Sequence, residues 1–217
     1  MSKFAFFDFD DTLAKGDSVL PYLMYCIRRG YAPWTQAPRA MLAYIKWLIN
    51  PQCVSGAKET TLSFIKGRTQ TEMQEIARDF FRDVQMKRVY AQGMQEILQL
   101  RSAGYEVVIV SASADVYMDL LTEFLPVTAV LATNCEKDAQ GRYTGKIGAN
   151  CKGEEKCRRI QAWLDQQGLT ADWPQCRAYG DSPSDGPMLA MTGLPTLVHP
   201  KKKLRRILPD ARQVHWR

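Results

Sequence analysis

Histidine is nearly absent from this chain of 217 residues, which holds only His199 and His215, both close to the C-terminal end of the sequence. A histidine general base or a histidine-rich metal site is therefore not expected. No run of 18 apolar residues occurs, so no membrane-spanning helix is expected. No signal peptide is apparent before the first predicted strand.

The cysteines also lack a pattern that would indicate a metal site or a redox motif. The chain has six of them, and no two form a C-x-x-C pair. We interpret them as free thiols in a reducing compartment, which predicts a cytoplasmic protein. They are Cys26, Cys53, Cys135, Cys151, Cys157 and Cys176.

The overall composition is that of a soluble globular protein, with 46% apolar and 24% charged residues. The formal net charge of +6 favours partners that carry phosphate groups or an anionic surface. Nucleic acid is not an expected partner, because the basic segment 201–206 has no interleaved aromatic residues and matches no nucleic-acid-binding motif.

An apolar stretch at the N-terminus ends in a group of carboxylates. Residues 3–7 predict a short strand buried on both faces, and Asp8, Asp10 and Asp11 follow it directly. Like charges at the end of a buried strand cost free energy unless a cation or a reacting group compensates them. An acidic turn that only caps the next helix is the simpler alternative.

Two further apolar strands end in polar residues. The segment 106–111 ends in Ser111, and the segment 177–181 ends in Asp181, with Asp185 four residues later. If these strands are parallel neighbours of the first one, all these groups meet at one edge of the sheet, where ligands bind in open α/β folds. Oxygen ligands without histidine favour Mg²⁺.

Strands that alternate with helices predict an α/β fold with a doubly wound, mostly parallel sheet. Residues 15–88 show no strand signal and predict an all-helical cap inserted after the first strand, while 1–14 and 89–217 form the catalytic core. A capping box at Thr69 and Glu72 starts the fourth cap helix. The cap helices are expected at about 19–28, 39–49 (closed by Pro51), 55–66 and 69–81, and a β-hairpin turn at 137–142.

These motifs resemble those of the haloacid dehalogenase-like (HAD) superfamily of phosphohydrolases. The first motif matches at Asp8-Phe9-Asp10-Asp11-Thr12-Leu13, the second at Val110-Ser111, and the fourth at Gly180-Asp181-Ser182-Pro183-Ser184-Asp185. The helical insertion between the first two motifs resembles the phosphoserine-phosphatase-like branch (subfamily IB). The resemblance extends over nearly the whole chain.

The resemblance implies a role for each matching residue. Asp8 is implied as the nucleophile that forms an aspartyl-phosphate and as a ligand of Mg²⁺. Asp10 is implied as the general acid and base, with its backbone carbonyl on the metal. Asp181 is implied as a metal ligand, and Asp185 as a second ligand or as a residue that orients one. Ser111 is implied to hydrogen-bond the transferring phosphoryl group.

The family also requires a lysine beside the nucleophile to offset phosphoryl charge. Lys152 and Lys156 are the two candidates. In this branch the lysine typically stands directly before a Gly-Glu pair that opens a helix, as Lys152 does, and Lys152 is therefore preferred. A cation at a helix N-terminus opposes the helix dipole, which gives Lys152 a further reason to have a function.

The substrate is less well defined than the chemistry. The predicted helix 55–66 contains no arginine to grip a substrate carboxylate, which weakens phosphoserine as the substrate. The helix 39–49 is apolar almost all round and carries Arg39, Lys46, Tyr44 and Trp47. It is either part of the cap core or a surface in peripheral contact with a membrane.

We therefore expect a Mg²⁺-dependent phosphomonoester phosphatase that acts on a small phosphate ester or a phospholipid monoester. A phosphotransferase or phosphomutase of the same superfamily is the alternative among enzymes. A non-catalytic phosphate- or membrane-binding module is the alternative outside them. The sequence leaves the oligomeric state open.

Overall fold

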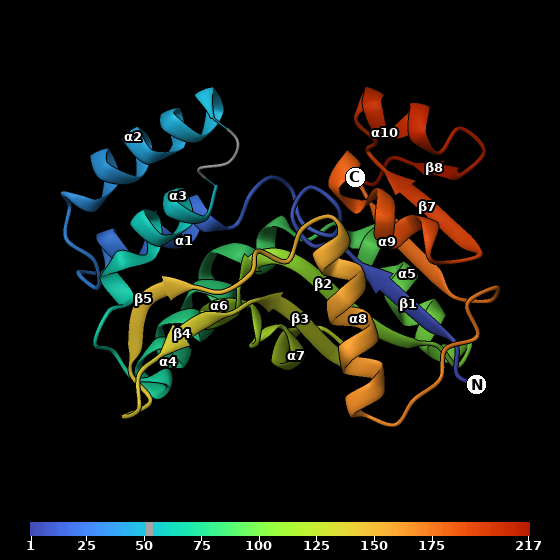
Figure 1. Cartoon of the computed structure of the whole chain (residues 1–217), viewed down its shortest axis with the longest axis horizontal. Coiled ribbons are helices and arrows are strands. Elements are labelled where there is room, and N and C mark those ends of the chain that lie inside the picture. The colour runs from blue at the N-terminus through green and yellow to red at the C-terminus, as the bar shows by residue number, and fades with distance from the viewer. Residues whose placement is uncertain (51–53) are drawn as a thin grey trace.

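The computed structural model describes residues 1–50 and 54–217. Its main sheet has six strands in the order β3-β2-β1-β6-β7-β8, and every neighbouring pair is parallel (Figure 1). The predicted doubly wound, mostly parallel sheet is confirmed. The strands are β1 (Phe4–Phe7), β2 (Glu106–Ala114), β3 (Ala129–Thr133), β6 (Arg177–Gly180), β7 (Leu194–Val198) and β8 (Arg212–Val214).

The first strand is central and completely buried, because β2 and β6 pair with it on either side. Its phenylalanines alternate between two hydrophobic cores, as strand geometry requires. Phe4 and Phe6 face α8 (Glu154–Gln166) and α9 (Gly186–Ala190). Phe7 lies on the side of α5 (Ala91–Ser102) and stacks on Tyr179 with 4.0 Å between the ring centroids. Helices therefore cover both faces of the sheet.

Between β1 and α5 the described residues form helices and turns without a strand of either sheet, in agreement with the predicted insertion. α2 begins at Gln36 rather than at residue 39, with Pro38 inside its first turn, where the missing N–H would have no helical acceptor. Pro51, predicted to close α2, lies outside the described residues. The main helices are α1 (Val19–Arg28), α2 (Gln36–Ile49), α3 (Val54–Leu62) and α4 (Gln70–Phe80), and short helical turns continue to Arg88.

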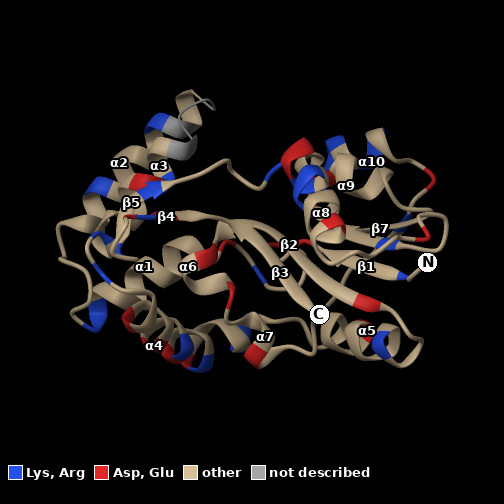
Figure 2. Ribbon diagram, turned by 60° about the horizontal axis from the view of Figure 1, so that its bottom comes forward, with Lys and Arg blue, Asp and Glu red and all other residues tan. Residues whose placement is uncertain are grey.

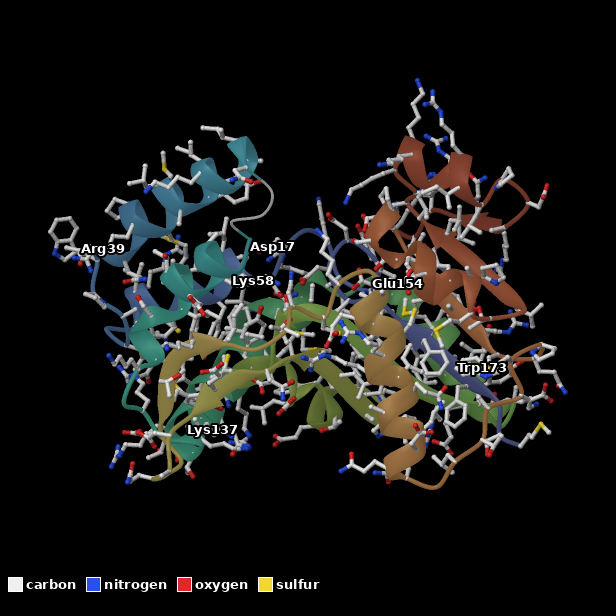
Figure 3. All side chains as sticks on the ribbon, viewed as in Figure 1. Asp17, Arg39, Lys58, Lys137, Glu154 and Trp173 are labelled. Atoms are coloured by element: carbon white, nitrogen blue, oxygen red, sulfur yellow. The ribbon has the colours of Figure 1, made fainter. Side chains whose placement is uncertain are left out.

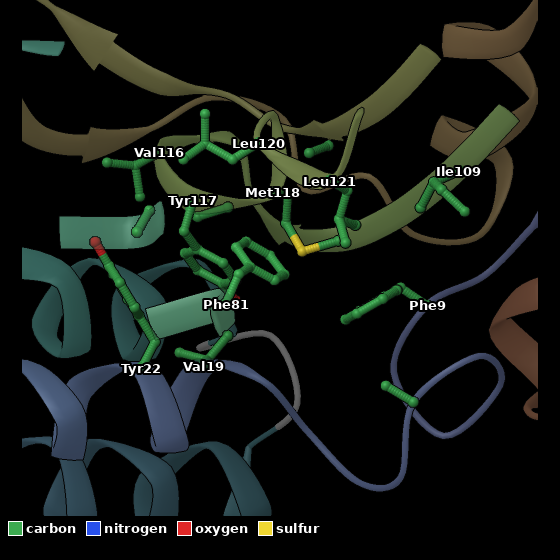
Figure 4. Packing of buried hydrophobic residues seen from close by; sticks show 14 of the residues in the cluster. Phe9, Val19, Tyr22, Phe81, Ile109, Val116, Tyr117, Met118, Leu120 and Leu121 are labelled. Carbon is green, nitrogen blue, oxygen red and sulfur yellow. The ribbon is translucent and has the colours of Figure 1, made fainter. Parts of the chain in front are cut away.

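A shared cluster of aromatic side chains joins this insertion to the rest of the molecule. Tyr22 of α1, Phe80 of α4 and Tyr117 of α6 (Asp115–Met118) are completely buried and contact one another, and Tyr22, Phe81 and Tyr117 are labelled in Figure 4. The helices of the insertion are therefore held in place by side chains that also cover the sheet.

The predicted hairpin is present as β4 (Cys135–Lys137) and β5 (Tyr143–Ile147). It extends the helical insertion rather than the main sheet, because backbone hydrogen bonds join Tyr143 to Gly67 and to Arg68. The hairpin thus brings a segment from the second half of the sequence against the cap (Figure 1).

Several element boundaries differ from those predicted. β2 continues three residues beyond Ser111, and two short helices follow it, α6 and α7 (Leu121–Phe124). β8 was not predicted, since its three residues are mostly exposed and show no apolar alternation. Among the described residues, no helix has both the length and the apolar character needed to cross a bilayer.

Candidate active site

A cavity of about 420 Å³ lies where the carboxyl ends of β1, β2 and β6 meet the helical insertion. Figure 3 labels Asp17 and Lys58 near this junction, with sheet residues below them. The core side of its lining includes Asp8, Asp10, Asp11, Ser113, Lys152, Lys156, Asp181, Asp185 and Lys201. The cap side includes Asp17, Val19, Leu20, Tyr44, Ala57, Lys58 and Thr61.

Three of the predicted carboxylates form one cluster. Oxygen atoms of Asp8, Asp181 and Asp185 lie within 4.8 Å of one another, and all three residues are buried. Lys156 bridges two of them, with its Nζ 2.7 Å from Asp8 Oδ1 and 2.7 Å from Asp185 Oδ1. Lys201 Nζ lies 2.5 Å from Asp181 Oδ2. The sheet order therefore brings together residues separated by more than 170 positions in the sequence.

Burial is the largest influence on the carboxyl pKa values in this cluster. Burial and the neighbouring Asp185 raise the pKa of Asp8 to about 8, although Lys156 acts against this shift. Burial also raises the pKa of Asp181 despite its pairing with Lys201. Burial acts to raise the pKa of Asp185 too, but Lys156 and the donors of Ser182 hold it below its usual value. Two ammonium groups do not balance the carboxylates.

The cluster fits a hard divalent cation. Its donors are carboxylate oxygens that converge from two strand ends, with spacings that a single ion can span. Three carboxylates face two ammonium groups here, and a divalent cation would offset the remaining negative charge, which burial makes costly. The residues of the cluster are thus suited to Mg²⁺ by donor type, burial and charge.

Asp10 is oriented differently from the cluster. Its Oδ2 accepts a hydrogen bond of 2.5 Å from Ser113 Oγ, and no described residue bonds its buried Oδ1. Burial and the nearby Asp17 raise the pKa of Asp10 to about 7. A carboxyl group with a pKa near neutrality can both give and take a proton, as general acid–base chemistry requires.

The preference for Lys152 is not supported by the geometry. Lys152 lines the cavity but is exposed, whereas Lys156 is 1% exposed and contacts Asp8 directly. Lys156 stands on the buried face of α8 with Ile160 and Leu164, at spacings of four residues. That spacing was the signal in the sequence, since a lysine on a core-facing stripe must meet buried carboxylates.

Ser111 is completely buried at the end of the predicted segment, and its Oγ accepts a hydrogen bond from the backbone N–H of Ser113. It does not line the cavity, whereas Ser113 does. The two serines lie two residues apart on β2, and the link between them connects Ser111 indirectly to Asp10.

Sequence reasoning did not assign three charged residues of the cavity. Lys201, read as part of a basic tail, reaches Asp181. Asp17 accepts hydrogen bonds from the N–H groups of Val19 and Leu20 at the start of α1, and it also lines the cavity. Lys58 crosses from α3 to the core, where its Nζ donates to the carbonyl of Ala112 and to Asn150, both at 2.6 Å. No local motif marks such contacts between cap and core.

Gly180 permits the close approach of Asp185 to the end of β6. A Cβ added at position 180 would lie 2.5 Å from the Cβ of Asp185, which is too close for any side chain. The glycine in the fourth motif is therefore needed because it leaves room for the carboxylate that pairs with Lys156.

A family model for haloacid dehalogenase-like hydrolases matches residues 5–190. The chain belongs to this family. Among solved structures, a protein of unknown function from Bordetella pertussis matches with a TM-score of 0.88 and 25% identity, over 99% of this chain and 98% of that one. A phospho-aspartyl intermediate analogue of phosphoserine phosphatase shares the fold, with a TM-score of 0.61 and 18% identity over 98% and 92% of the chains.

Curated relatives agree with this assignment. Phosphoserine phosphatase SerB1 of Mycobacterium tuberculosis is 26% identical over 98% of this chain and 68% of its own length. Histidinol-phosphatase of Neisseria meningitidis serogroup C is 24% identical over 100% and 97% of the two lengths. The predictions of a HAD-type phosphatase and of a phosphoserine-phosphatase-like branch are confirmed.

Proposed function

We propose that this HAD hydrolase is a Mg²⁺-dependent phosphomonoester phosphatase that works through an aspartyl-phosphate on Asp8. The observation that carries the proposal is the position of the Asp8 carboxylate. It lines the cavity, contacts the Lys156 ammonium at 2.7 Å, and lies within 4.8 Å of carboxylate oxygens of Asp181 and Asp185. A phosphoryl group at Asp8 would meet positive charge and a proton donor in the same cavity.

The chain's own groups account for both steps of hydrolysis. In the first step Asp8 Oδ attacks phosphorus, the bond from phosphorus to the leaving oxygen breaks, and Asp10 gives that oxygen its proton. In the second step Asp10 takes a proton from water, whose oxygen attacks phosphorus and releases phosphate and the Asp8 carboxylate. Lys156, whose pKa is raised by Asp185 and Asp8 despite its burial, stays charged throughout and stabilises the phosphoryl oxygens.

The metal proposal uses the same residues. Asp8, Asp181 and the Asp10 backbone carbonyl would hold Mg²⁺, with Asp185 as a further ligand or as the residue that orients the others. When bound, the ion would offset phosphoryl charge during transfer. We propose Ser111 as a group that positions the end of β2 and its link to Asp10, since it does not line the cavity.

We further propose that residues 15–88 act as a cap over the core formed by 1–14 and 89–217. Lys58 supports this division, because it is a cap residue that reaches core acceptors inside the cavity. An ammonium group has three donors, and the contacts with Ala112 and Asn150 use two of them, so one is available for a substrate. Lys58 and Asp17 would then contact the part of the substrate beyond the phosphate. The substrate itself would be a small phosphorylated metabolite or a phospholipid monoester.

Turnover of p-nitrophenyl phosphate tests the proposal. The wild type should release phosphate with Mg²⁺, lose activity with a chelator, and recover when Mg²⁺ is restored. Asp8→Asn should abolish turnover and keep the fold, whereas the control Asp165→Asn, on the exposed side of α8, should retain activity. Near-wild-type activity of Asp8→Asn would refute the assignment. Phosphate transfer to an added alcohol would indicate a phosphotransferase, and binding without turnover a non-catalytic module.

A further inference from the structure

The cap helix α2 exposes most of its apolar side chains. Among the described side chains of α2, the two buried ones are Gln36 and Ala40, each at 2% exposure, so the packed stripe consists of small and polar residues. The apolar residues exposed on α2 are Met41 (65%), Leu42 (56%), Tyr44 (44%), Ile45 (41%), Leu48 (60%) and Ile49 (81%). The side chain of Trp47 lies outside the described residues. A helix with this pattern requires a cover of low polarity.

The charges on α2 have one sign. Arg39 and Lys46 are its charged residues, and the helix sequence contains no aspartate or glutamate. Both cations also line a groove of about 340 Å³ between α2 and α3. This combination of apolar side chains and cations is typical of a helix at the boundary between lipid headgroups and acyl chains.

A second basic element projects on the same side of the molecule. Figures 1 and 2 show α2 and α10 (Lys202–Ile207) projecting in the same direction from opposite ends of the fold. Leu204 anchors α10 in the core, and Lys202 and Arg206, one turn apart, lie on the face opposite to it. The exposed cations of α10 are Lys202, Lys203, Arg205 and Arg206, and the helix carries no acidic residue.

The catalytic cavity lies between these two helices. Tyr44 of α2 and Lys201, which directly precedes α10, both line it. Ala57 of α3 lines the cavity and also the groove between α2 and α3. The cavity and the groove are therefore adjacent at Ala57, and the groove borders Leu42, one of the exposed apolar residues of α2.

We propose that α2 and α10 dock this enzyme on an anionic lipid surface, and that its substrate is a phosphate monoester with an acyl chain that occupies the groove between α2 and α3. The proposal rests on the phosphatase function proposed above. A second copy of the chain is a less suitable cover, because it would bring the same cations to a face that has no carboxylate on either helix. Anionic headgroups match both helices at once.

Co-sedimentation tests the docking surface independently of catalysis. Vesicles of equal parts phosphatidylcholine and phosphatidylglycerol should bring most of the wild type into the pellet at low salt, and about 0.5 M salt should release it. Pure phosphatidylcholine vesicles should retain little protein. Leu48→Ser with Ile49→Ser, and separately Lys202→Glu with Arg206→Glu, should each weaken binding about tenfold or more.

Two matched controls separate the docking surface from general effects. Leu98→Ser on α5 removes a leucine of similar exposure, and Lys3→Glu reverses a charge directly before β1, at the amino ends of the strands. Both should bind vesicles as the wild type does and should hydrolyse p-nitrophenyl phosphate normally. Thermal unfolding of every variant checks the fold.

The substrate class is tested with a pair of esters that share one headgroup. Lysophosphatidate should be hydrolysed with a kcat/KM at least about tenfold above that of glycerol 3-phosphate, because only the former fills the groove. Wild type that stays in the supernatant at low salt, or variants that bind like the wild type, would overturn the proposal. So would a dimer that Leu48→Ser with Ile49→Ser dissociates. If the wild type does not hydrolyse p-nitrophenyl phosphate at all, the phosphatase function itself is refuted.

Discussion

The two walls of the catalytic cavity differ in how their residues are held. On the core wall, Asp8, Lys156 and Asp185 are almost completely buried and paired at 2.7 Å, so their positions are fixed by the sheet and by each other. On the cap wall, Lys58 bonds neutral acceptors, and Leu20 and Tyr44, which also line the cavity, are exposed. We propose that the chemistry belongs to the buried, paired wall and substrate recognition to the cap wall, so substitutions on the two sides should have different effects.

The largest effect after loss of the nucleophile is expected at Asp10. Asp10→Asn removes the proton donor while the amide can still bond Ser113, so the fold should remain. We expect kcat to fall by roughly 10²–10⁴-fold with little change in KM. The measurement is steady-state turnover of an ester with a poor leaving group. An ester with a good leaving group should lose less, and equal losses for both would argue against an acid role.

The two lysines provide a direct comparison within the core wall. Lys156→Met should lower kcat by about 10²–10³-fold, because it removes the donor beside Asp8. It should also destabilise the protein by roughly 3–5 kcal/mol, since two buried carboxylates lose their partner. Lys152→Met, at an exposed site, should change thermal stability little. If Lys152→Met loses more activity and stability than Lys156→Met, Lys152 is the lysine that stabilises the phosphoryl group.

The packing of the core wall can be disturbed without changing a charge. Gly180→Ala places a Cβ against Asp185 and should cost about 1–3 kcal/mol of stability through overpacking. Activity should fall as Asp185 moves. Gly186→Ala is the matched control, because a Cβ there meets open space. Chemical denaturation of both variants measures the difference, and equal stability would show that the strand end can relax.

The smallest effect is expected on the cap wall. Burial lowers the pKa of Lys58 to about 8, so its ammonium is charged below that pH and becomes neutral above it. For an anionic substrate that contacts Lys58, KM should rise several-fold as the pH increases through about 8, with kcat nearly constant. Lys58→Met should have a KM that does not change with pH and that equals the raised KM of the wild type above pH 8. A wild-type KM independent of pH would remove Lys58 from recognition.

The contrast between the walls also explains what the sequence could predict. The meeting of the strand-end residues Asp8, Asp10 and Asp181 in one cavity was predictable, because the ends of neighbouring parallel strands meet regardless of the length of chain between them. Lys156 was ranked second because motif position outweighed its place on the buried stripe of α8. Lys58 and Lys201 were not assigned, since their roles depend on where the cap and the C-terminal segment pack.

The boundaries of buried core strands were also easier to predict than those of the cap helix α2. The buried strands were located to within a few residues, because burial fixes their apolar sequence. α2 was predicted to start too late, since Pro38 is compatible with a first helical turn. The exposure of α2 could not be predicted, because an apolar helix buried in its own bundle has the same sequence pattern.

Chemical trapping of the intermediate tests the central claim most directly. Wild-type protein that is quenched in acid during turnover and reduced with borohydride should have the side chain at position 8 converted to homoserine, located by peptide mass spectrometry. The same treatment of Asp8→Asn should give no reduced product. A product at another carboxylate would contradict the assignment of Asp8 as the nucleophile. Rapid turnover with no trapped residue would favour direct attack of water on the ester.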